Sequence, residues 1–439
     1  MQKILLDMLK AEVKPALGCT EPVAVALACA KAKELLGEEI VECNIYVSPN
    51  VYKNGMCVGI PGTTRLGLKI AASMGLNGGE SELGLRVLEK LGEEEVAISE
   101  KFMDQNMVKI SPIETSEKVY IEVNLKGKEN TSKIIIMTKH DNFVHIQKND
   151  SVILNGEISL DVEYTHVDSP AVKLTIKELI QEIEKMDESD LDFLLEGIDM
   201  NMDMANVAIE DKIGIGVGYG IKKAMDDKML SDDLMNRAMM LTAAASDARM
   251  SGINKPVMSS NGSGNHGLTA ILPIAAYNEM YPQTKEKLSK ALAISHLVTG
   301  YIKNYTGRLS AVCGCGVAAS TGSAAAITWL MGGTYDQING SIENMIANLS
   351  GMICDGAKAG CALKLASAAS AAIQSAVIAK YNCIVPALNG IVGNKVEESI
   401  RNLGKVSAQG MTMTDEVIIK VMDGMNNNQS IVDKNLLFN

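Results

Sequence analysis

The sequence predicts an α+β protein in which an N-terminal mixed α/β domain packs on a larger, all-helical domain. β-Rich runs gather before residue 170. From Ser169-Pro170 onward, apolar residues recur at spacings close to the 3.6-residue period of a helix. The length of 439 residues suits about two or three domains. We therefore expect a mixed domain over residues 1–170 and an all-helical domain over residues 171–439.

The first domain is expected to contain short helices and paired strands. A glycine-flanked turn at Cys19 leads into a predicted helix over 23–36, because the acidic residue and the proline that follow suit a first helical turn. β-Rich runs are found at 40–47, 119–125, 133–138 and 142–148. The last two flank the polar stretch Lys139-His140-Asp141 and predict a β-hairpin.

The second domain has helical periodicity almost to its end. Helices are expected at 171–186, 232–245, 284–303 and 363–379. Glycine-rich interruptions separate the helices at 251–267, 313–316, 332–340 and 388–393. We expect these loops to converge on a site. The uncharged stretch between Arg308 and Asp336 is long enough to span a bilayer. Its glycine, serine and threonine content instead favours close packing inside a helical domain.

Composition excludes several classes of protein. The net charge of −12 argues against a nucleic-acid partner or an anionic membrane surface. Hydrophobic residues make up 47% and charged residues 21%, which is typical of a globular protein. The N-terminus carries a charge as early as Asp7, too soon for a secretory segment, and nine cysteines do not form a simple disulfide framework. We expect a cytoplasmic protein with reduced cysteines, whose composition allows a homodimer.

Four of the nine cysteines lie in two glycine-rich stretches, Cys313-Gly314-Cys315-Gly316 and 354–361. Glycine lets backbone approach a bulky inorganic group, and thiolates are soft ligands for iron–sulfur clusters or zinc. Cys354 and Cys361 are seven residues apart, and the glycines between them favour a loop that enters a helix at Cys361.

The Cys-Gly-Cys step is expected to supply one metal ligand. In extended chain its two thiols share a face but lie too far apart to chelate easily, so either Cys313 or Cys315 would bind. Spacing alone does not distinguish zinc from a cluster, although the close cysteine pairs that zinc favours do not occur in these stretches. The remaining cysteines other than Cys19 are expected to be buried for packing, namely Cys29, Cys43, Cys57 and Cys383.

Six motifs occur in an order that resembles the L-cysteine desulfidase family, which is related to the iron–sulfur-dependent L-serine dehydratases. They lie at 14–22, 50–55, 59–63, 261–267, 313–316 and 352–358. The resemblance spans essentially the whole chain. It implies a [4Fe–4S] cluster held by three cysteines with one iron open to substrate. It also implies cleavage of L-cysteine to pyruvate, ammonia and sulfide.

The resemblance identifies two of the three cluster ligands and leaves the third open between two cysteines. Cys354 and Cys361 match the closely spaced pair, and Cys313 and Cys315 both qualify as the third ligand. The alanine-rich stretch at 317–326 slightly favours Cys313. The dehydratases separate their two ligand cysteines by more than seven residues, so the spacing here is nearer to that of the desulfidases.

Two residues are candidates for proton transfer. Cys19 resembles the remaining family cysteine, as a base at the substrate or as a transient ligand. A cysteine near a helix N-terminus has a stabilised thiolate, so we expect a lowered pKa. His266 is the best placed histidine for a catalytic or substrate role. An open iron would act as a Lewis acid toward the leaving group, and sulfur matches iron in softness.

The substrate carboxylate needs an anion site. The glycine-rich loop at 259–267 precedes a helix expected to begin near Leu268, and free N–H groups at a helix N-terminus bind anions. The loop offers Asn261, Ser263, Gly264 and Asn265 as candidates. Turns in the first domain add Asn50, Lys53, Asn54 and Thr63.

Three functions remain open from the sequence. The first is a cluster-dependent L-cysteine desulfidase, and the second is an L-serine dehydratase of the same cluster class. The third is a non-enzymatic sensor of an amino acid or a cluster. No recognisable DNA-binding or partner module accompanies the acidic chain, which disfavours the third.

Overall fold

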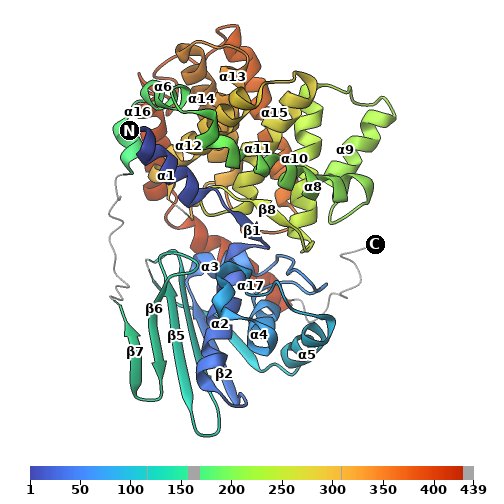
Figure 1. The fold of residues 1–439 in the computed structure, drawn as a ribbon, viewed down its shortest axis with the longest axis vertical. Helices are drawn as coiled ribbons and strands as arrows, with labels where there is room; N and C mark the ends of the chain where they lie inside the picture. Colours follow the sequence, from blue (N-terminus) through green and yellow to red (C-terminus); the bar gives the residue numbers. More distant parts are fainter. Residues whose placement is uncertain (116, 157–168, 308, 429–439) are drawn as a thin grey trace.

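The structure, a computed structural model, describes residues 1–115, 117–156, 169–307 and 309–428. Figure 1 shows two parts stacked along the long axis of the molecule, a larger helical part and a smaller part built on a sheet. This arrangement confirms the predicted α+β fold with a mostly helical larger part.

A six-stranded sheet forms the smaller part, in the order β3-β2-β4-β5-β6-β7. Neighbouring strands are antiparallel except β2 and β3, which are parallel. The antiparallel pairing of β5 with β6 confirms the predicted hairpin, whereas β3 and β7 were not anticipated. The strands are β2 (Glu42–Val47), β3 (Val108–Pro112), β4 (Tyr120–Lys126), β5 (Thr131–Met137), β6 (Phe143–Lys148) and β7 (Ser151–Asn155).

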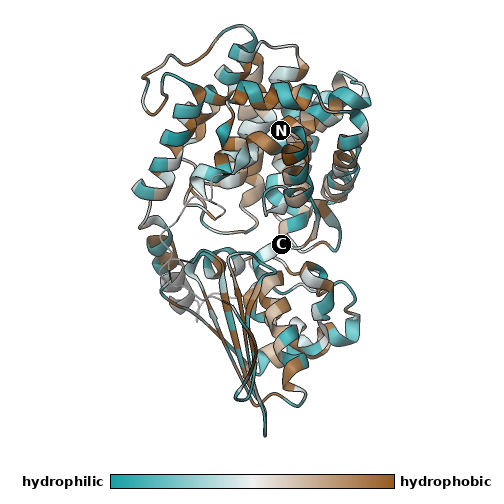
Figure 2. Ribbon diagram, turned by 60° about the vertical axis from the view of Figure 1, so that its left-hand side comes forward, coloured by the Kyte–Doolittle hydropathy of each residue, from teal (hydrophilic) through white to brown (hydrophobic). Residues whose placement is uncertain are grey.

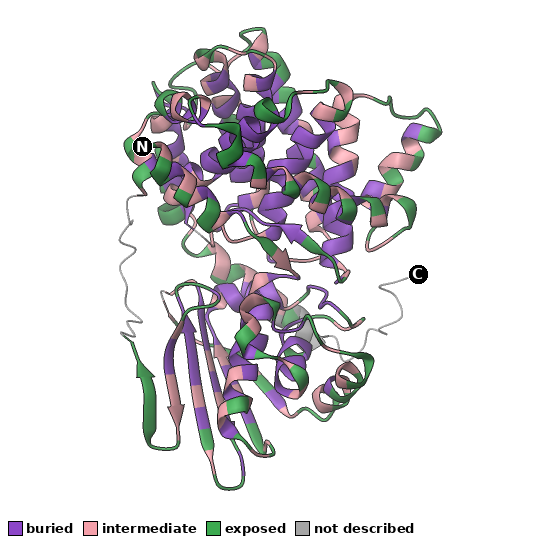
Figure 3. Cartoon of the chain, in the orientation of Figure 1, coloured by how far each residue is buried: buried purple, intermediate pink, exposed green. Residues whose placement is uncertain are grey.

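Helices cover one face of this sheet. Hydrophilic and hydrophobic residues alternate along the strands (Figure 2), as expected where one face is buried. The edge strand β7 is exposed along its length (Figure 3). Helices α2 and α4 approach each other closely at Gly75 of α4. A Cβ there would lie 2.3 Å from the carbonyl oxygen of Ala26 in the alanine-rich helix α2. The helices here are α2 (Thr20–Leu36), α3 (Pro49–Gly55), α4 (Leu68–Gly78), α5 (Glu93–Asp104) and the 3-10 helix η1 (Ser81–Arg86).

The larger part is helical apart from a two-stranded antiparallel pairing of β1 (Pro15–Leu17) with β8 (Pro256–Met258). Its α-helices are α1 (Gln2–Glu12), α6 (Ile176–Glu184), α7 (Glu188–Leu191), α8 (Glu196–Glu210), α9 (Val217–Asp226), α10 (Leu234–Met250), α11 (Gly264–Met280), α12 (Lys285–Thr306), α13 (Ser320–Leu330), α14 (Tyr335–Leu349), α15 (Cys361–Lys380) and α16 (Val396–Lys405). Shorter turns are the 3-10 helices η2 (Pro170–Lys173) and η3 (Asp192–Leu194) and the π-helices η4 (Gly314–Ala319) and η5 (Val406–Gly410).

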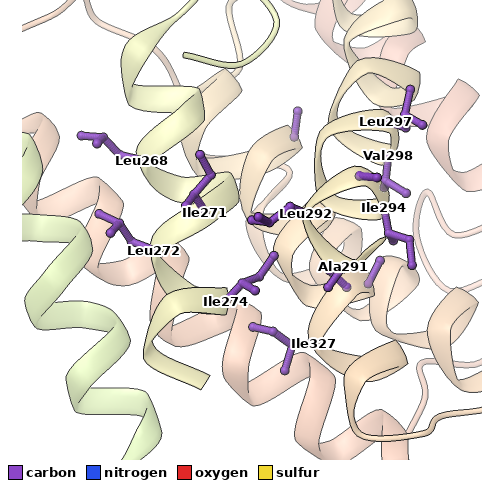
Figure 4. Packing of buried hydrophobic residues seen from close by; sticks show 14 of the residues in the cluster. Leu268, Ile271, Leu272, Ile274, Ala291, Leu292, Ile294, Leu297, Val298 and Ile327 are labelled. Carbon is purple, nitrogen blue, oxygen red and sulfur yellow. The ribbon is translucent and has the colours of Figure 1, made fainter. Parts of the chain in front are cut away.

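Aliphatic side chains of α11, α12 and α13 form the centre of this part. Ile271 and Ile274 of α11 lie beside Leu292 of α12, and Ile327 of α13 lies below them (Figure 4). The apolar helix α15 is long enough to cross a membrane by length and composition, but it packs against α10, α13 and α14. Such packing is typical of the core helix of a globular domain.

Several helix boundaries differ from the prediction. The helix expected at 171–186 is divided into the 3-10 turn η2 and α6, because Thr175 caps α6 through a hydrogen bond from the Glu178 N–H. The helix expected near Leu268 begins at Gly264, because the glycine-rich loop supplies its whole first turn. The interruption expected at 332–340 is mostly helical, because Thr334 accepts a hydrogen bond from the Gln337 N–H and caps α14.

The two parts of the structure do not follow the boundary expected at residue 170. The first helix and the last described helix each pack on the part to which the expected boundary did not assign them. Leu5 and Leu9 of α1 belong to the helical core. At the other end, α17 (Thr414–Asn428) contacts α3 in the smaller part (Figure 1). Cys361 packs against both hydrophobic cores. The junction of the two parts is therefore built from distant segments of the chain.

Candidate active site

A buried cavity lies at the junction of the two parts. Its walls come from the turn before α2, from α3, from the facing ends of α10, α11 and α12, and from both cysteine stretches. Predicted site residues that line it are Cys19, Asn50, Lys53, Asn54, Ser263, Asn265, His266, Cys313, Cys315, Cys354 and Cys361. Segments more than 300 residues apart thus meet at one place.

Three predicted residues are not among those that line the cavity. Thr63 donates a hydrogen bond to Glu100 at 2.5 Å and belongs to the smaller part. Asn261 donates to the carbonyl oxygen of His296 and therefore supports the loop. Gly264 lies against the guanidinium of Arg249, where a Cβ would be 2.4 Å from Nε. Its lack of a side chain is what leaves room for that arginine.

The backbone holds Cys313 beside Cys354. The Cys313 N–H donates to the Met352 carbonyl oxygen, and the Cys354 N–H donates to the Ala311 carbonyl oxygen, both at 2.7 Å. After this two-strand contact the chain turns at Gly356, with a φ of 93°, and enters α15 at Cys361 as predicted. A Cβ at Gly356 would lie 2.3 Å from the Lys53 carbonyl oxygen, so only glycine fits there.

The Cys-Gly-Cys step is not extended, and the expectation that its two thiols lie far apart is wrong. The chain coils into η4 directly after Cys313, which brings the Cys315 thiol into hydrogen-bond contact with Cys313. The Gly316 N–H also donates to Cys313 Sγ at 3.4 Å. The hydrogen bond from Cys315 lowers the pKa of Cys313 to about 6, despite burial. The same contact raises the pKa of Cys315.

The donor set fits an iron–sulfur cluster. Cys313, Cys315, Cys354 and Cys361 all line the same cavity. Among the described residues, no three His, Cys, Asp or Glu side chains are close enough to hold a single metal ion. A cubane cluster places its ligands on separate irons, so its cysteines stand farther apart than those of a zinc ion. Burial raises the pKa of Cys354, and that of Cys361 to about 12, so metal binding would have to displace their protons.

Cys19 caps the N-terminus of α2, and its side chain is buried. Burial raises the pKa of its thiol to about 11, and the nearby Arg249 only partly opposes that shift. The expected lowering of the Cys19 pKa is therefore wrong. Removal of the thiolate from water outweighs the favourable field of the helix N-terminus. Cys19 is a neutral thiol at neutral pH.

His266 is held as a neutral imidazole. Its Nδ1 lies 3.2 Å from the Ser260 carbonyl oxygen, which only accepts hydrogen bonds, so Nδ1 carries the proton. Burial and then the charge of Lys303 keep the pKa of His266 well below its ordinary value. The unprotonated Nε2 faces Gly314, where a Cβ would lie only 2.4 Å away. A proton acceptor thus lies beside the cysteine stretch.

Sequence reasoning missed several charged residues of the cavity. Arg249 from α10, Glu21 from α2, Lys303 from α12 and Lys364 from α15 all line it. Arg249, Lys303 and Lys364 lie inside helices where no local motif distinguishes them. Glu21 lies within the motif at 14–22, but the sequence indicates for it only a place in the first helical turn. Lys364 pairs with Asp355 and donates to the Ile353 carbonyl oxygen at 2.8 Å, which fixes the loop that carries Cys354.

The cavity combines thiols, a neutral histidine and cationic side chains, a set of groups suited to acid–base and metal chemistry. The profile of the serine dehydratase alpha chain family matches residues 82–420. A UPF0597 protein of Clostridioides difficile is 65% identical, over 96% of this chain and 99% of its own length. Others from Alkaliphilus metalliredigens and Caldanaerobacter subterraneus are 52% and 43% identical, over 96% and 95% of this chain and 95% and 98% of their own. The chain belongs to the serine dehydratase alpha chain family and is a lyase-like enzyme.

Proposed function

We propose that this enzyme eliminates the β-substituent of a small L-amino acid, with a [4Fe–4S] cluster held by Cys354, Cys361 and Cys313. The observation that carries the proposal is the meeting of these thiols and the neutral His266 in one buried cavity. Family membership supports L-serine as the substrate, with pyruvate and ammonia as products.

The cluster, when bound, would supply a Lewis-acidic iron for the leaving group. The other steps belong to side chains. We assign the removal of the unacidic Cα proton to His266 Nε2, because this nitrogen carries no proton and faces the cysteine stretch. Cys19, with a pKa of about 11, suits the donor rather than the acceptor of a proton. Burial of both groups keeps bulk water from the reacting carbon.

L-Cysteine is the second candidate substrate, with sulfide as the leaving group. The spacing of seven residues between Cys354 and Cys361 supports it, and sulfur suits a soft iron centre. A non-enzymatic sensor has no support of this kind. A cytoplasmic location and a homodimer remain predictions.

Anaerobic reconstitution with iron and sulfide, followed by pyruvate assays with L-serine and L-cysteine in parallel, tests the proposal. We expect iron bound by the wild type and turnover of at least one substrate. Cys361→Ala should lose the iron. Cys383→Ala is the matched control, because Cys383 lies outside the cavity. The expected burial of Cys383 and Cys57 is wrong, since both are exposed, whereas Cys29 and Cys43 are buried as predicted.

Two results would overturn the proposal. One is a reconstituted wild type that binds no iron. The other is a Cys361→Ala variant that retains both iron and full turnover. The ratio of the two kcat/KM values decides between serine and cysteine as the preferred substrate.

A further inference from the structure

One cation and one anion flank the thiol of Cys19. Arg249 is 4% exposed and Glu21 is 8% exposed, and both line the cavity. After burial, the charges with the largest effects on the pKa of Cys19 are those of Arg249, which lowers it, and Glu21, which raises it. Two opposite charges thus lie within electrostatic reach of the Cys19 thiol and line the same cavity.

Among the residues that the structure describes, Arg249 has only uncharged hydrogen-bond partners, one of which is the Cys19 thiol. Its NH1 donates to Asn265 Oδ1 at 2.9 Å, and its NH2 donates to the Gly18 carbonyl oxygen at 2.7 Å. Both acceptors are neutral. Its Nε is buried and has no partner within the described ranges. A buried guanidinium in such surroundings favours an anion, and its planar fork matches a carboxylate.

The N-terminus of α11 adds a second attraction for an anion at the same place. Arg249 lies directly against Gly264, the first residue of this helix. The neighbouring residues Ser263 and Asn265 line the cavity. Ser263 caps the helix without a side-chain hydrogen bond to its N–H groups. The partial positive charge of the helix end therefore reinforces that of the guanidinium.

Glu21 presents the complementary charge. Its Oε1 accepts a hydrogen bond from Asn54 at 2.9 Å, and its Oε2 accepts one from Thr20 at 3.0 Å. Both donors are neutral, and each carboxylate oxygen has a further lone pair. Within the described part of the chain, Glu21 forms no ion pair with lysine or arginine. A buried carboxylate of this kind favours an ammonium group.

We propose that Arg249 and Glu21 bind the two charged groups of a zwitterionic α-amino acid. Arg249 and the start of α11 bind the carboxylate, and Glu21 with Asn54 holds the α-ammonium. The assignment rests on the proposed function for the choice of an amino acid as ligand. It places Cα beside Cys19. It also distinguishes substrate from product, because a 2-oxo acid has no ammonium group for Glu21 and is released.

Calorimetric titration of the reconstituted enzyme with L-alanine, L-lactate and L-alaninamide tests this assignment without turnover. L-Alanine has both charges and no leaving group, L-lactate lacks the ammonium, and L-alaninamide lacks the carboxylate. We expect the wild type to bind L-alanine roughly 10- to 100-fold more tightly than either analogue, as for the loss of a charged hydrogen-bond partner.

Each variant should lose the preference for L-alanine over one of the two analogues and keep the preference over the other. Glu21→Gln keeps the oxygen that accepts from Asn54, and we expect it to lose only the preference for L-alanine over L-lactate. Arg249→Gln should lose only the preference over L-alaninamide, and Arg249→Lys should restore part of it. If Arg249→Gln does not fold, Glu21→Gln and Arg249→Lys decide the question.

Equal weakening of all three ligands in each variant would overturn the assignment, because a merely structural role has that effect. The same holds if the wild type binds the analogues as tightly as L-alanine. A wild type that discriminates as expected but releases no pyruvate contradicts the proposed function alone. If the wild type turns over substrate but the variants keep its preference for L-alanine over both analogues, the zwitterion assignment is wrong and the proposed function stands.

Discussion

The ammonium of Lys53 lies 2.9 Å from the carbonyl oxygen of Cys354, in the loop that enters α15. Its other partner is Asp415 of α17, at 2.6 Å, which also accepts a hydrogen bond from Asn50. Lys53 was predicted to contact substrate, but in the structure it connects the last helix of the described chain to a cysteine loop. It is 1% exposed, so the pair with Asp415 offsets the cost of burying an ammonium group.

Removal of Asp415 should therefore destabilise the protein. Asp415→Ala leaves a buried ammonium without its carboxylate, at a cost of about 3 kcal/mol in the free energy of unfolding. Urea denaturation measures it. Asp226→Ala breaks the exposed pair with Lys222 and should cost far less, because water already screens both charges. Equal costs for the two variants would show that Lys53 does not depend on Asp415.

Replacement of Gly356 tests the turn between Cys354 and Cys361. Gly356→Ala combines a left-handed φ with a Cβ 2.3 Å from a backbone oxygen, so overpacking adds about 1–3 kcal/mol to a strain of about 1–2 kcal/mol. Gly332→Ala has a similar φ of 69° but open space around the new Cβ, so it should show the strain alone. Denaturation curves of both variants give the difference, and indistinguishable curves would contradict the packing at Gly356.

The two sulfurs of Cys-Gly-Cys should differ in iron binding. Cys313 already accepts hydrogen bonds from Cys315 and the Gly316 N–H, so it is the better thiolate ligand. We expect Cys313→Ala to lose most of the bound iron and Cys315→Ala to keep it, measured as iron and sulfide per chain after anaerobic reconstitution. The reverse result would make Cys315 the ligand.

Acid should destabilise the fold through His296. Burial lowers the pKa of His296 from 6.5 to about 3, so between these values the unfolded chain binds a proton that the folded chain does not. The free energy of unfolding contributed by this group is therefore present above pH 6.5 and falls as pH falls, with a limiting slope of about 1.4 kcal/mol per pH unit.

His296→Asn provides the matched comparison, since the amide can still bond to Ser260. The difference in unfolding free energy between variant and wild type should shrink as the pH is lowered from 7 to 5. A difference independent of pH would mean that His296 is protonated in the folded state as readily as in the unfolded chain.

Local patterns predicted those parts of the site that depend on neighbours in sequence. The glycines around Cys354 and Cys361 led correctly to a loop that enters a helix at Cys361, because backbone freedom is a local property. The coil at Cys313 was missed, since a π-helical turn has no clear sequence signal. The raised pKa of Cys19 also escaped prediction, because burial depends on the whole fold.

Charged residues of the cavity could not be predicted for a related reason. Arg249 of α10 and Glu21 of α2 come to line the same cavity only after the two parts of the molecule have met at the junction. Asp415 meets Lys53 across 362 positions of sequence. A single sequence carries no local trace of such pairings, so the sequence pointed to the cysteines and to Lys53 but not to Arg249, Lys303 or Lys364.

The placement of α1 in the helical core and of α17 on α3 has a consequence for synthesis. A nascent chain that has left the ribosome only as far as residue 170 has no partner for Leu5 and Leu9, and Lys53 still lacks Asp415. Lys53 gains its carboxylate only once α17 has been synthesised. A chain that ends before α17 therefore leaves the ammonium that supports the Cys354 loop without its ion pair.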